Sequence, residues 1–436
     1  PNAVGLVGPD LSSIGLDGET RQPGMSTEEY LRESIISPNA FIAPQCPTGG
    51  CPENVMLPNL VEKLTPNELD LILAHLLTLT GEGEFQIPEY ELVPIDIVRP
   101  PETDGETFLE PPTIYDDAQV LLGKYMFFDP RLSGDAGVSC ATCHNPEMAW
   151  TDGAALNQGY PGTAYFRNAP TVMNTAFRSY LYWDGRMDGL DMPTLVRDHL
   201  TEAHFMNTDG RLMVERVKQV PEYVQLFQEA YGSNPSFGGI LRAITAYVQS
   251  LNSGMSAYDE YLGGDEGALS EAAIAGLELF EGKAGCASCH TGLTFSDDKF
   301  YVLDVPDNQE VWSDPLRHIS FRRFFRLFGV PNYRNLTRDP GLYALTKEDE
   351  EWGAFRTAPL REVAKTAPYM HNGFFTTLEE VVRFYNDGAV DGQPLELSDD
   401  EITQLEAFLE SLSSELPEVE PPELPDYQLR PLGDNR

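Results

Sequence analysis

The chain has 436 residues, 41% of them hydrophobic, and its 69 acidic and 29 basic side chains give a net charge of −40. At roughly 100 to 200 residues per domain this length predicts about three domains, and no apolar run reaches the ~18 residues of a membrane span. The acidity argues against binding to nucleic acid or anionic membranes, and it fits a basic protein partner or a high-salt habitat equally well.

Residues 1–85 contain one well-marked helix, expected at about 65–80. Thr65 can cap it, Pro66 suits the first helical position, and Glu68 completes a capping box. Leucines at positions 69, 73 and 76 form an apolar stripe. The first ten residues lack the charged and apolar regions of a signal peptide, so we expect any such peptide to have been removed.

Residues 86–113 differ in composition from what precedes and follows them. They hold six prolines among acidic residues. Such a composition favours an extended, semi-rigid linker over a folded element.

The stretches 140–144 (CATCH) and 286–290 (CASCH) share the pattern Cys-x-x-Cys-His. In this pattern the thiols can add to the vinyl groups of a haem while the adjacent histidine ligates the iron. A redox or zinc site would use other partners, and two copies in one chain argue against chance. We therefore expect two covalent haems, held by Cys140, Cys143 and His144 and by Cys286, Cys289 and His290.

Covalent haem implies a periplasmic or otherwise exported protein, because c-type haem is assembled outside the cytoplasm. Two further cysteines, Cys46 and Cys51, lie close together in the sequence. In an oxidising compartment a short-loop disulfide between them is the simplest expectation, with free thiols as the alternative.

Further motifs follow the two haem sites in a fixed order. They are 150–153 (WTDG), 167–171 (RNAPT), 183–186 (WDGR), 355–361 (FRTAPLR) and 366–373 (TAPYMHNG). With these motifs, residues 114–412 resemble the bacterial dihaem cytochrome c peroxidase superfamily, and in detail its MauG-like branch. The resemblance implies a mainly α fold in which two cytochrome c-like domains, at 114–264 and 265–413, form a dihaem peroxidase core.

Residues 1–85 resemble the later two thirds of a small class I cytochrome c, beginning at the Gly-Pro-Asp-Leu turn of 8–11. In that family a methionine matching Met56 is the distal iron ligand, and the Cys-x-x-Cys-His motif lies upstream of the turn. No such motif precedes the turn here, which leaves two alternatives: a third haem on a lost N-terminal piece, or a partial domain without haem. An isolated methionine is usually a core residue.

The resemblance gives the two haems different roles. The haem on His144 has an open distal side for peroxide, the haem on His290 passes electrons, and Trp183 matches a tryptophan between them. Ordinary peroxidases of the family use methionine as distal ligand of the second haem and MauG-like proteins use tyrosine. Tyr385 matches that tyrosine, with Met370 as the alternative; an anionic phenolate favours ferric iron.

Peroxide cleavage needs an acid or base that moves a proton between the two oxygens. Glu202 lies where the family keeps its distal glutamate, and His204 is a rival with a suitable pKa range. The family's distal glutamine falls at Met192 or Pro193, which is a departure. The loop at 157–162 lacks the histidine that caps the iron in peroxidases needing reductive activation, so we expect the first haem to be open without prior reduction.

Two other features bear on the haem core. Asn168, Thr357 and Pro359 match calcium ligands of the family, the last two through backbone carbonyls, although Asn168 also suits a turn cap. Arginines then cluster with three phenylalanines in an otherwise acidic chain. For this basic island we favour haem propionates or interdomain docking over an acidic partner. The island comprises Arg317, Arg322, Arg323, Arg326, Arg334, Phe321, Phe324 and Phe325.

The sequence thus predicts a partial cytochrome c domain (1–85), a linker (86–113), two haem domains, and a proline-rich acidic tail (414–436) that forms an extended arm. The predicted function is a dihaem c-type oxidoreductase that reduces hydrogen peroxide with electrons from a cytochrome-type donor. The alternatives are a MauG-like high-valent haem oxidase that modifies a partner protein, and a non-catalytic electron-transfer subunit. Whether the chain joins an oligomer or a larger assembly is left open.

Overall fold

The computed structural model describes residues 14–22, 24–37, 115–390, 392–416 and 418–428, with single residues at 69, 72, 73, 76, 77 and 79. The chain divides into two compact units, 1–94 and 95–436. The predicted linker, Met56, Cys46 and Cys51 lie outside the described residues.

The N-terminal unit is built on α1 (Ile14–Arg21) and α2 (Thr27–Ile36). Ser26 and Glu29 form a capping box at the start of α2. The predicted leucine stripe is confirmed at Leu69 and Leu73, which are helical and buried in a core with residues of both helices. The other members of that core are Ile14, Tyr30, Leu31 and Ile35.

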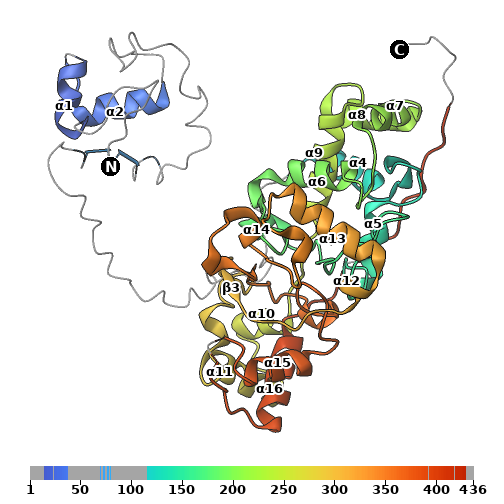
Figure 1. The fold of residues 1–436 in the computed structure, drawn as a ribbon. Helices are drawn as coiled ribbons and strands as arrows, with labels where there is room; N and C mark the ends of the chain where they lie inside the picture. The colour runs from blue at the N-terminus through green and yellow to red at the C-terminus, as the bar shows by residue number, and fades with distance from the viewer. Residues whose placement is uncertain are drawn as a thin grey trace. The chain divides into compact units, whose positions relative to one another are not determined.

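The second unit is mainly helical, as predicted, with two short two-stranded antiparallel sheets. Helices α7 and α8 lie at one end and α11, α15 and α16 at the other (Figure 1). The helices are α4 (Asp117–Phe128), α5 (Cys140–Cys143), α6 (Met192–Thr201), α7 (Gly210–Val217), α8 (Pro221–Tyr231), α9 (Phe237–Gln249), α10 (Ala257–Leu262), α11 (Glu271–Glu281), α12 (Glu310–Ser313), α13 (Pro315–Leu327), α14 (Tyr343–Thr346), α15 (Leu378–Asn386) and α16 (Asp399–Ser411). Strand β1 (Tyr180–Leu181) pairs with β2 (Met187–Asp188), and β3 (Phe300–Val302) pairs with β4 (Ala354–Arg356).

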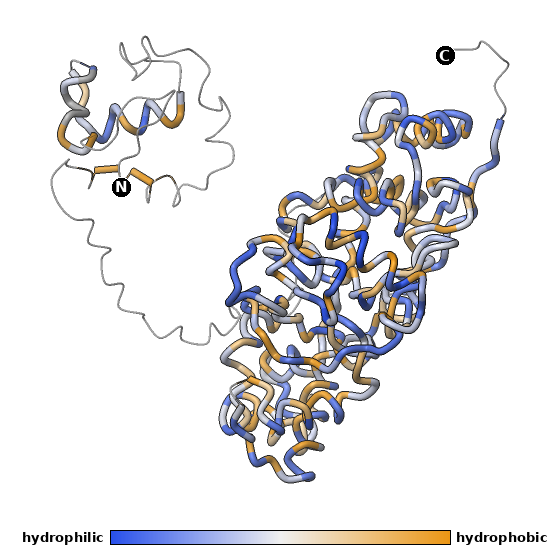
Figure 2. Tube along the Cα trace, in the orientation of Figure 1, coloured by the Kyte–Doolittle hydropathy of each residue, from blue (hydrophilic) through white to orange (hydrophobic). Residues whose placement is uncertain are grey.

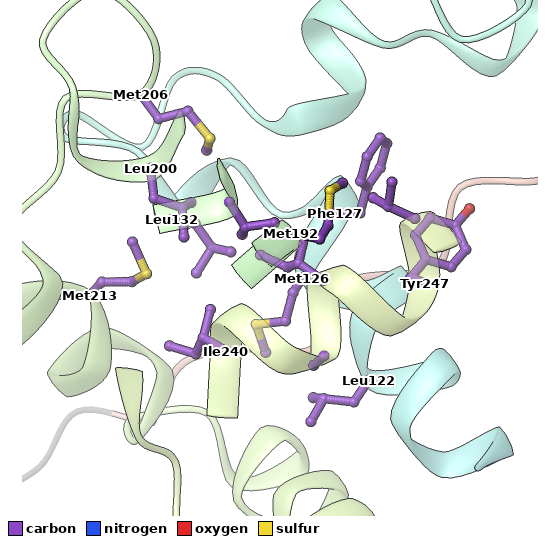
Figure 3. Close-up of a cluster of buried hydrophobic side chains, with 14 of the residues drawn as sticks. Leu122, Met126, Phe127, Leu132, Met192, Leu200, Met206, Met213, Ile240 and Tyr247 are labelled. Carbon is purple, nitrogen blue, oxygen red and sulfur yellow. The ribbon is translucent and has the colours of Figure 1, made fainter. Parts of the chain in front are cut away.

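The core of the first haem domain forms where α4 crosses α9. Gly123 permits this close approach, because a Cβ there would lie 1.9 Å from the carbonyl oxygen of Ala243. Side chains from α4, α6, α7 and α9 fill the space around the crossing, among them Met126, Met192 and Ile240 (Figure 3).

The core of the second haem domain repeats this arrangement with α11 and α16. Gly276 takes the place of Gly123, since a Cβ on it would lie 2.0 Å from the carbonyl oxygen of Gln404. Phe280 and Phe408 pack beside the crossing, with ring centroids 5.0 Å apart. Each haem motif is therefore held by a domain whose main helix pair meets at a glycine.

A third cluster joins α13 to the loop after the first haem motif. Phe321, Phe324 and Phe325 of α13 are buried against Phe166. The exposed side of the helix is mixed, with Arg322, Arg323 and Arg326 beside Leu316, Ile319 and Leu327. Hydrophobic and hydrophilic residues alternate along the tube of the second unit (Figure 2).

The C-terminal tail runs along the first haem domain. Leu416 and Val419 pack against its core, and the backbone N–H of Gln428 donates to the carbonyl oxygen of Gln219 over 2.7 Å. The guanidinium of Arg131 donates to the carbonyl oxygen of Pro425. Among the described helices, none has the length and apolar character needed to cross a membrane.

Candidate functional site

The first Cys-x-x-Cys-His motif lines a large cavity. Helix α5 begins at Cys140, after a capping box of Ser139 with Thr142, and ends at Cys143. Both cysteines and His144 line a cavity of about 1240 Å³, part of it open to solvent. The imidazole Nδ1 of His144 lies 3.1 Å from the carbonyl oxygen of Trp150. Because a carbonyl can only accept, Nδ1 is the donor, and the free lone pair on Nε2 is available to an iron.

The second motif has the same geometry in its own cavity. Gly285, in the left-handed region at φ 64°, leads into the 3-10 turn Cys286–Ser288. His290 Nδ1 lies 3.1 Å from the carbonyl oxygen of Phe295, so Nδ1 is again the donor. Cys286 and His290 line a cavity of about 1300 Å³, also partly open.

The chemistry of both cavities fits a covalent haem. The four motif cysteines are free, and burial raises the pKa of Cys140 to about 12 and that of Cys286 to about 11. Thiols kept neutral by burial argue against a site that binds a metal through thiolates. The described residues contain no cluster of three or more His, Cys, Asp or Glu side chains able to hold a metal ion.

Arg178 supplies a second indication of haem. Its side chain lines both cavities, and its Nε is buried without a hydrogen-bond partner in the described structure. Burial, assisted by the nearby charge of Arg356, lowers the pKa of Arg178 to about 9. Asp298 offsets only part of this shift, and the guanidinium donates to the carbonyl oxygen of Met173 over 2.7 Å. A buried guanidinium with no close carboxylate among the described residues favours an anionic group such as a haem propionate.

Trp183 lies between the two cavities and lines both. Its indole N–H donates to the backbone carbonyl oxygen of Asn168 over 3.0 Å. The next residue, Asp184, is buried between Arg167 and Arg186, with N–O distances of 2.6 and 3.0 Å. Burial alone would raise the pKa of Asp184, but the two guanidiniums outweigh it and lower that pKa. The tryptophan is therefore fixed by its own hydrogen bond and by a buried ion cluster.

Two candidate distal ligands of the second haem line its cavity. Tyr385 lies in the last turn of α15, whose start is fixed by a capping box of Thr377 with Glu380. Burial, reinforced by the charge of the motif thiols, raises the pKa of Tyr385. Met370 lines the same cavity from the loop before α15. The choice of Tyr385 over Met370 stays a prediction.

Glu202 and His204 are not among the residues that line the first cavity. Glu202 follows Thr201, the last residue of α6. Burial alone would raise the pKa of Glu202, but its hydrogen bond to His204 and the charges of Arg186 and His199, which both line the cavity, lower that pKa. Its carboxylate lies 2.9 Å from Nε2 of His204, whose ring stacks on Tyr165 at a centroid distance of 5.0 Å. Both residues are absent from the cavity lining. Whether Glu202 or His204 moves a proton at the first haem stays a prediction.

His199 lines the first cavity instead. It lies one helical turn after Leu195, which also lines the cavity, as do Val196 and Leu200, whose side chains belong to the core. The spacing of Leu195 and His199 on α6 is the sequence signal that could have identified this residue.

The predicted calcium ligands have other partners. The amide nitrogen of Asn168 donates to the carbonyl oxygen of Ala154 over 2.9 Å. The carbonyl oxygen of Thr357 accepts from the hydroxyl of Ser296 over 2.8 Å and from the guanidinium of Arg356 over 3.3 Å. Pro359 lines the second haem cavity. A calcium ion stays a prediction.

The basic island does not reach either haem cavity. Arg317 is buried and donates to the carbonyl oxygen of Asn157 over 2.8 Å, whereas Arg322, Arg323 and Arg326 are exposed. None of these arginines lines a haem cavity. Arg178, which the sequence analysis missed, lines both cavities.

Comparisons with known proteins agree with this geometry. Residues 117–267 match the family model described as di-haem cytochrome c peroxidase. The chain is 48% identical to cytochrome-c peroxidase IdrP2 of Pseudomonas sp. (strain SCT) over 321 residues, which cover 73% of this chain and 87% of that protein. It is 35% identical to the methylamine utilization protein MauG of Methylorubrum extorquens, over 70% of this chain and 81% of that protein.

Solved structures show the same fold. A MauG-like protein associated with microbial copper homeostasis superposes with a TM-score of 0.61 at 27% identity, covering 72% of this chain and 95% of the other. The diheme peroxidase BthA of Burkholderia thailandensis superposes with a TM-score of 0.56 at 24% identity, covering 72% and 91%.

Proposed function

The chain belongs to the dihaem cytochrome c peroxidase family, which includes the MauG proteins, and we propose that it reduces hydrogen peroxide with electrons from a cytochrome-type donor. It is a haem oxidoreductase with two covalent c-type haems. When bound, these haems supply the redox chemistry, in which peroxide takes up two electrons and two protons and yields two molecules of water.

The residues of the chain bind and orient the two groups. Cys140 and Cys143 attach the first haem and His144 ligates it, with the imidazole held by the carbonyl of Trp150. The same roles fall to Cys286, Cys289 and His290 in the second cavity, where the carbonyl of Phe295 orients the histidine. Arg178 offers its guanidinium to propionates from either cavity.

The position of Trp183 carries the proposal. A half-buried aromatic ring that lines both cavities gives electrons a short path from the second haem site to the first. The hydrogen bond to Asn168 and the ion cluster at Asp184 hold the ring in one orientation. Fixed geometry favours electron transfer, because it avoids reorganisation of the path at each turnover.

A MauG-like oxidation of a partner protein is the second candidate. It is favoured by Tyr385 in the second cavity, since a phenolate ligand stabilises ferric and more oxidised iron. In this alternative the electrons come from a side chain of the partner and not from a cytochrome.

Steady-state oxidation of reduced cytochrome c by hydrogen peroxide tests the main proposal. We expect two molecules of reduced cytochrome to be consumed for each peroxide. The MauG-like function would instead be favoured if peroxide is consumed, no added cytochrome is oxidised, and a co-purifying protein is covalently modified.

The proposal extends to three further features: an exported location, a third haem and a calcium ion. Covalent haem attachment places the protein in the periplasm or another exported location. A third haem with Met56 as ligand would require a motif upstream of the present first residue, and an intact mass of the natural protein would count the haems. Elemental analysis of the same sample would test for calcium.

A further inference from the structure

The exposed side of α13 carries arginine and large aliphatic side chains together. An α-helix turns by about 100° per residue, which places six of its side chains within an arc of about 140°. All six are exposed, Ile319 by 64% and Leu327 by 74%. We call this surface the α13 face, and its residues are Leu316, Ile319, Arg322, Arg323, Arg326 and Leu327.

No ion pair joins the three arginines of the α13 face to a carboxylate in the described part of the chain. Elsewhere exposed arginines do pair, since Arg211 lies 3.1 Å from Asp209 and Arg383 lies 2.8 Å from Glu379. Acidic side chains outnumber basic ones by 69 to 29, so three neighbouring arginines without one are unexpected. Their guanidiniums are available to carboxylates of another molecule.

The α13 face rests on a packed base. The opposite side of the helix buries Phe321, Phe324 and Phe325, which are 1%, 4% and 0% exposed. The carboxylate of Asp314 caps the helix by accepting from the backbone N–H of Leu316 over 2.8 Å. A partner would thus meet a helix that is already ordered, which lowers the entropic cost of binding.

Both kinds of side chain on the α13 face suit a protein interface. Exposed aliphatic groups gain free energy when a partner removes them from water. Arginine is enriched where protein partners bind tightly, because its planar guanidinium can make two hydrogen bonds to one carboxylate. The complementary surface therefore presents acidic side chains beside apolar ones.

Two other occupants fit the α13 face less well. An anionic membrane would meet a chain of net charge −40, which opposes its approach. A second copy bound through a two-fold contact on this face would place arginines against arginines, because both subunits use the same surface. A folded acidic protein can cover the α13 face alone, and the acidity of the surrounding surface steers it away from other positions.

The buried side of α13 touches the lining of the first haem cavity. The ring of Phe324 lies 6.4 Å from that of Tyr165, and the guanidinium of Arg186 lies 5.1 Å from the centre of the Phe324 ring. Tyr165 and Arg186 both line the cavity. A protein docked on the α13 face would be separated from this lining by the one helix.

We propose that the α13 face is the docking surface for an acidic protein whose own surface combines carboxylates with aliphatic side chains. The proposal goes beyond the proposed function and does not depend on whether the chain reduces peroxide. It concerns only the exposed arginines of the basic island, for which the sequence analysis had favoured other roles over an acidic partner.

Two synthetic helical peptides with the same leucines test the surface, one with glutamates beside the leucines and the other with glutamines. Fluorescence anisotropy with the haem-loaded protein would measure their binding. We expect the glutamate peptide to bind at low salt and the glutamine peptide to bind much more weakly. Raising the ionic strength should weaken binding of the glutamate peptide, because the contacts are exposed and screened by salt.

The face variant combines Arg322→Gln, Arg323→Gln and Arg326→Gln, and it should weaken binding of the glutamate peptide by about tenfold or more. The matched control combines Arg197→Gln, Arg211→Gln and Arg383→Gln. It removes the same charge from exposed arginines that already pair with acids, and it should bind like the wild type. Haem content and circular dichroism would show that both variants are folded.

Several results would overturn the proposal. One is a glutamate peptide that does not bind, and another is a loss of affinity that is equal in the face variant and the control. Self-association in sedimentation that only the face variant lacks would assign the surface to a second copy. Binding to vesicles of anionic phospholipid that only the face variant lacks would assign it to a membrane.

Discussion

The indole nitrogen of Trp183 and the backbone carbonyl oxygen of Asn168 are joined by a hydrogen bond of 3.0 Å, and both residues line the two haem cavities. Where the two cavities adjoin, Trp183 is thus held by a hydrogen bond and not by packing alone. This pair fixes the orientation of the ring that we propose as the electron path.

Replacing Trp183 with phenylalanine should slow peroxide-dependent oxidation of cytochrome c by about 10- to 100-fold, because the smaller ring loses its hydrogen bond and its fixed position. Steady-state rates at saturating peroxide would measure the effect, with haem content as a check on assembly. Trp312→Phe is the control, since Trp312 packs on Phe321 and lines neither cavity. Equal rates in the two variants would contradict a role for Trp183 in the path.

Asp184→Asn should lower the free energy of unfolding by about 3 to 5 kcal/mol, because it leaves Arg167 and Arg186 buried without their shared carboxylate. Urea unfolding of the haem-loaded protein would measure this loss. The exposed pair of Lys218 with Glu215 provides the comparison, and Glu215→Gln should cost less than about 1 kcal/mol. If Asp184→Asn also lowered the free energy of unfolding by less than about 1 kcal/mol, the ion cluster would not be needed for stability.

The contribution of Asp184 should depend on pH. Its pKa is lowered in the folded protein, so its stabilisation is fully present above the unfolded pKa of about 3.9 and is lost as the pH falls through the folded pKa. The difference in unfolding free energy between wild type and Asp184→Asn should therefore be constant near neutral pH and shrink in acid. A difference that grows in acid would have the wrong sign.

Tyr385→Met should raise the reduction potential of the second haem, because a neutral thioether replaces an anionic oxygen ligand. Spectroelectrochemical titration of the two haems would measure the shift. Met370→Leu should leave the potential almost unchanged if Tyr385 is the ligand. The reverse pattern would identify Met370 as the ligand instead.

Gly123→Ala should destabilise the first haem domain by about 1 to 3 kcal/mol or more, because its Cβ would lie 1.9 Å from the Ala243 carbonyl oxygen. Gly238, also in a helix, has no atom within 4 Å of such a Cβ. Gly238→Ala should therefore stabilise by about 0.5 to 1 kcal/mol. Thermal unfolding would measure the change in stability of each variant. Similar changes in the two variants would argue against a close crossing of α4 and α9.

The parts of the site that the sequence could predict are those encoded locally. Cys140, Cys143 and His144 belong to one turn of the chain, so their spacing alone specifies how they hold a haem. Trp183 was recognised because it begins an unbroken motif. In these cases neighbours in sequence are also neighbours in the site.

The distal side of the first haem could not be predicted in the same way. Glu202 is separated from His199 by less than one helical turn, but α6 ends between them and only His199 lines the cavity. Arg178 gave no local signal, because its significance depends on Arg356, which lies far along the chain. Such residues acquire their roles from tertiary contacts.

The core beneath the first haem contains sulfur close to the proposed oxidant. Met192 and Met206 line the cavity and are otherwise buried (Figure 3). Any peroxide that enters and escapes reduction meets these thioethers, and oxidation would turn an apolar side chain into a polar sulfoxide inside the core. Each failed turnover can thus leave a chemical record at these two positions.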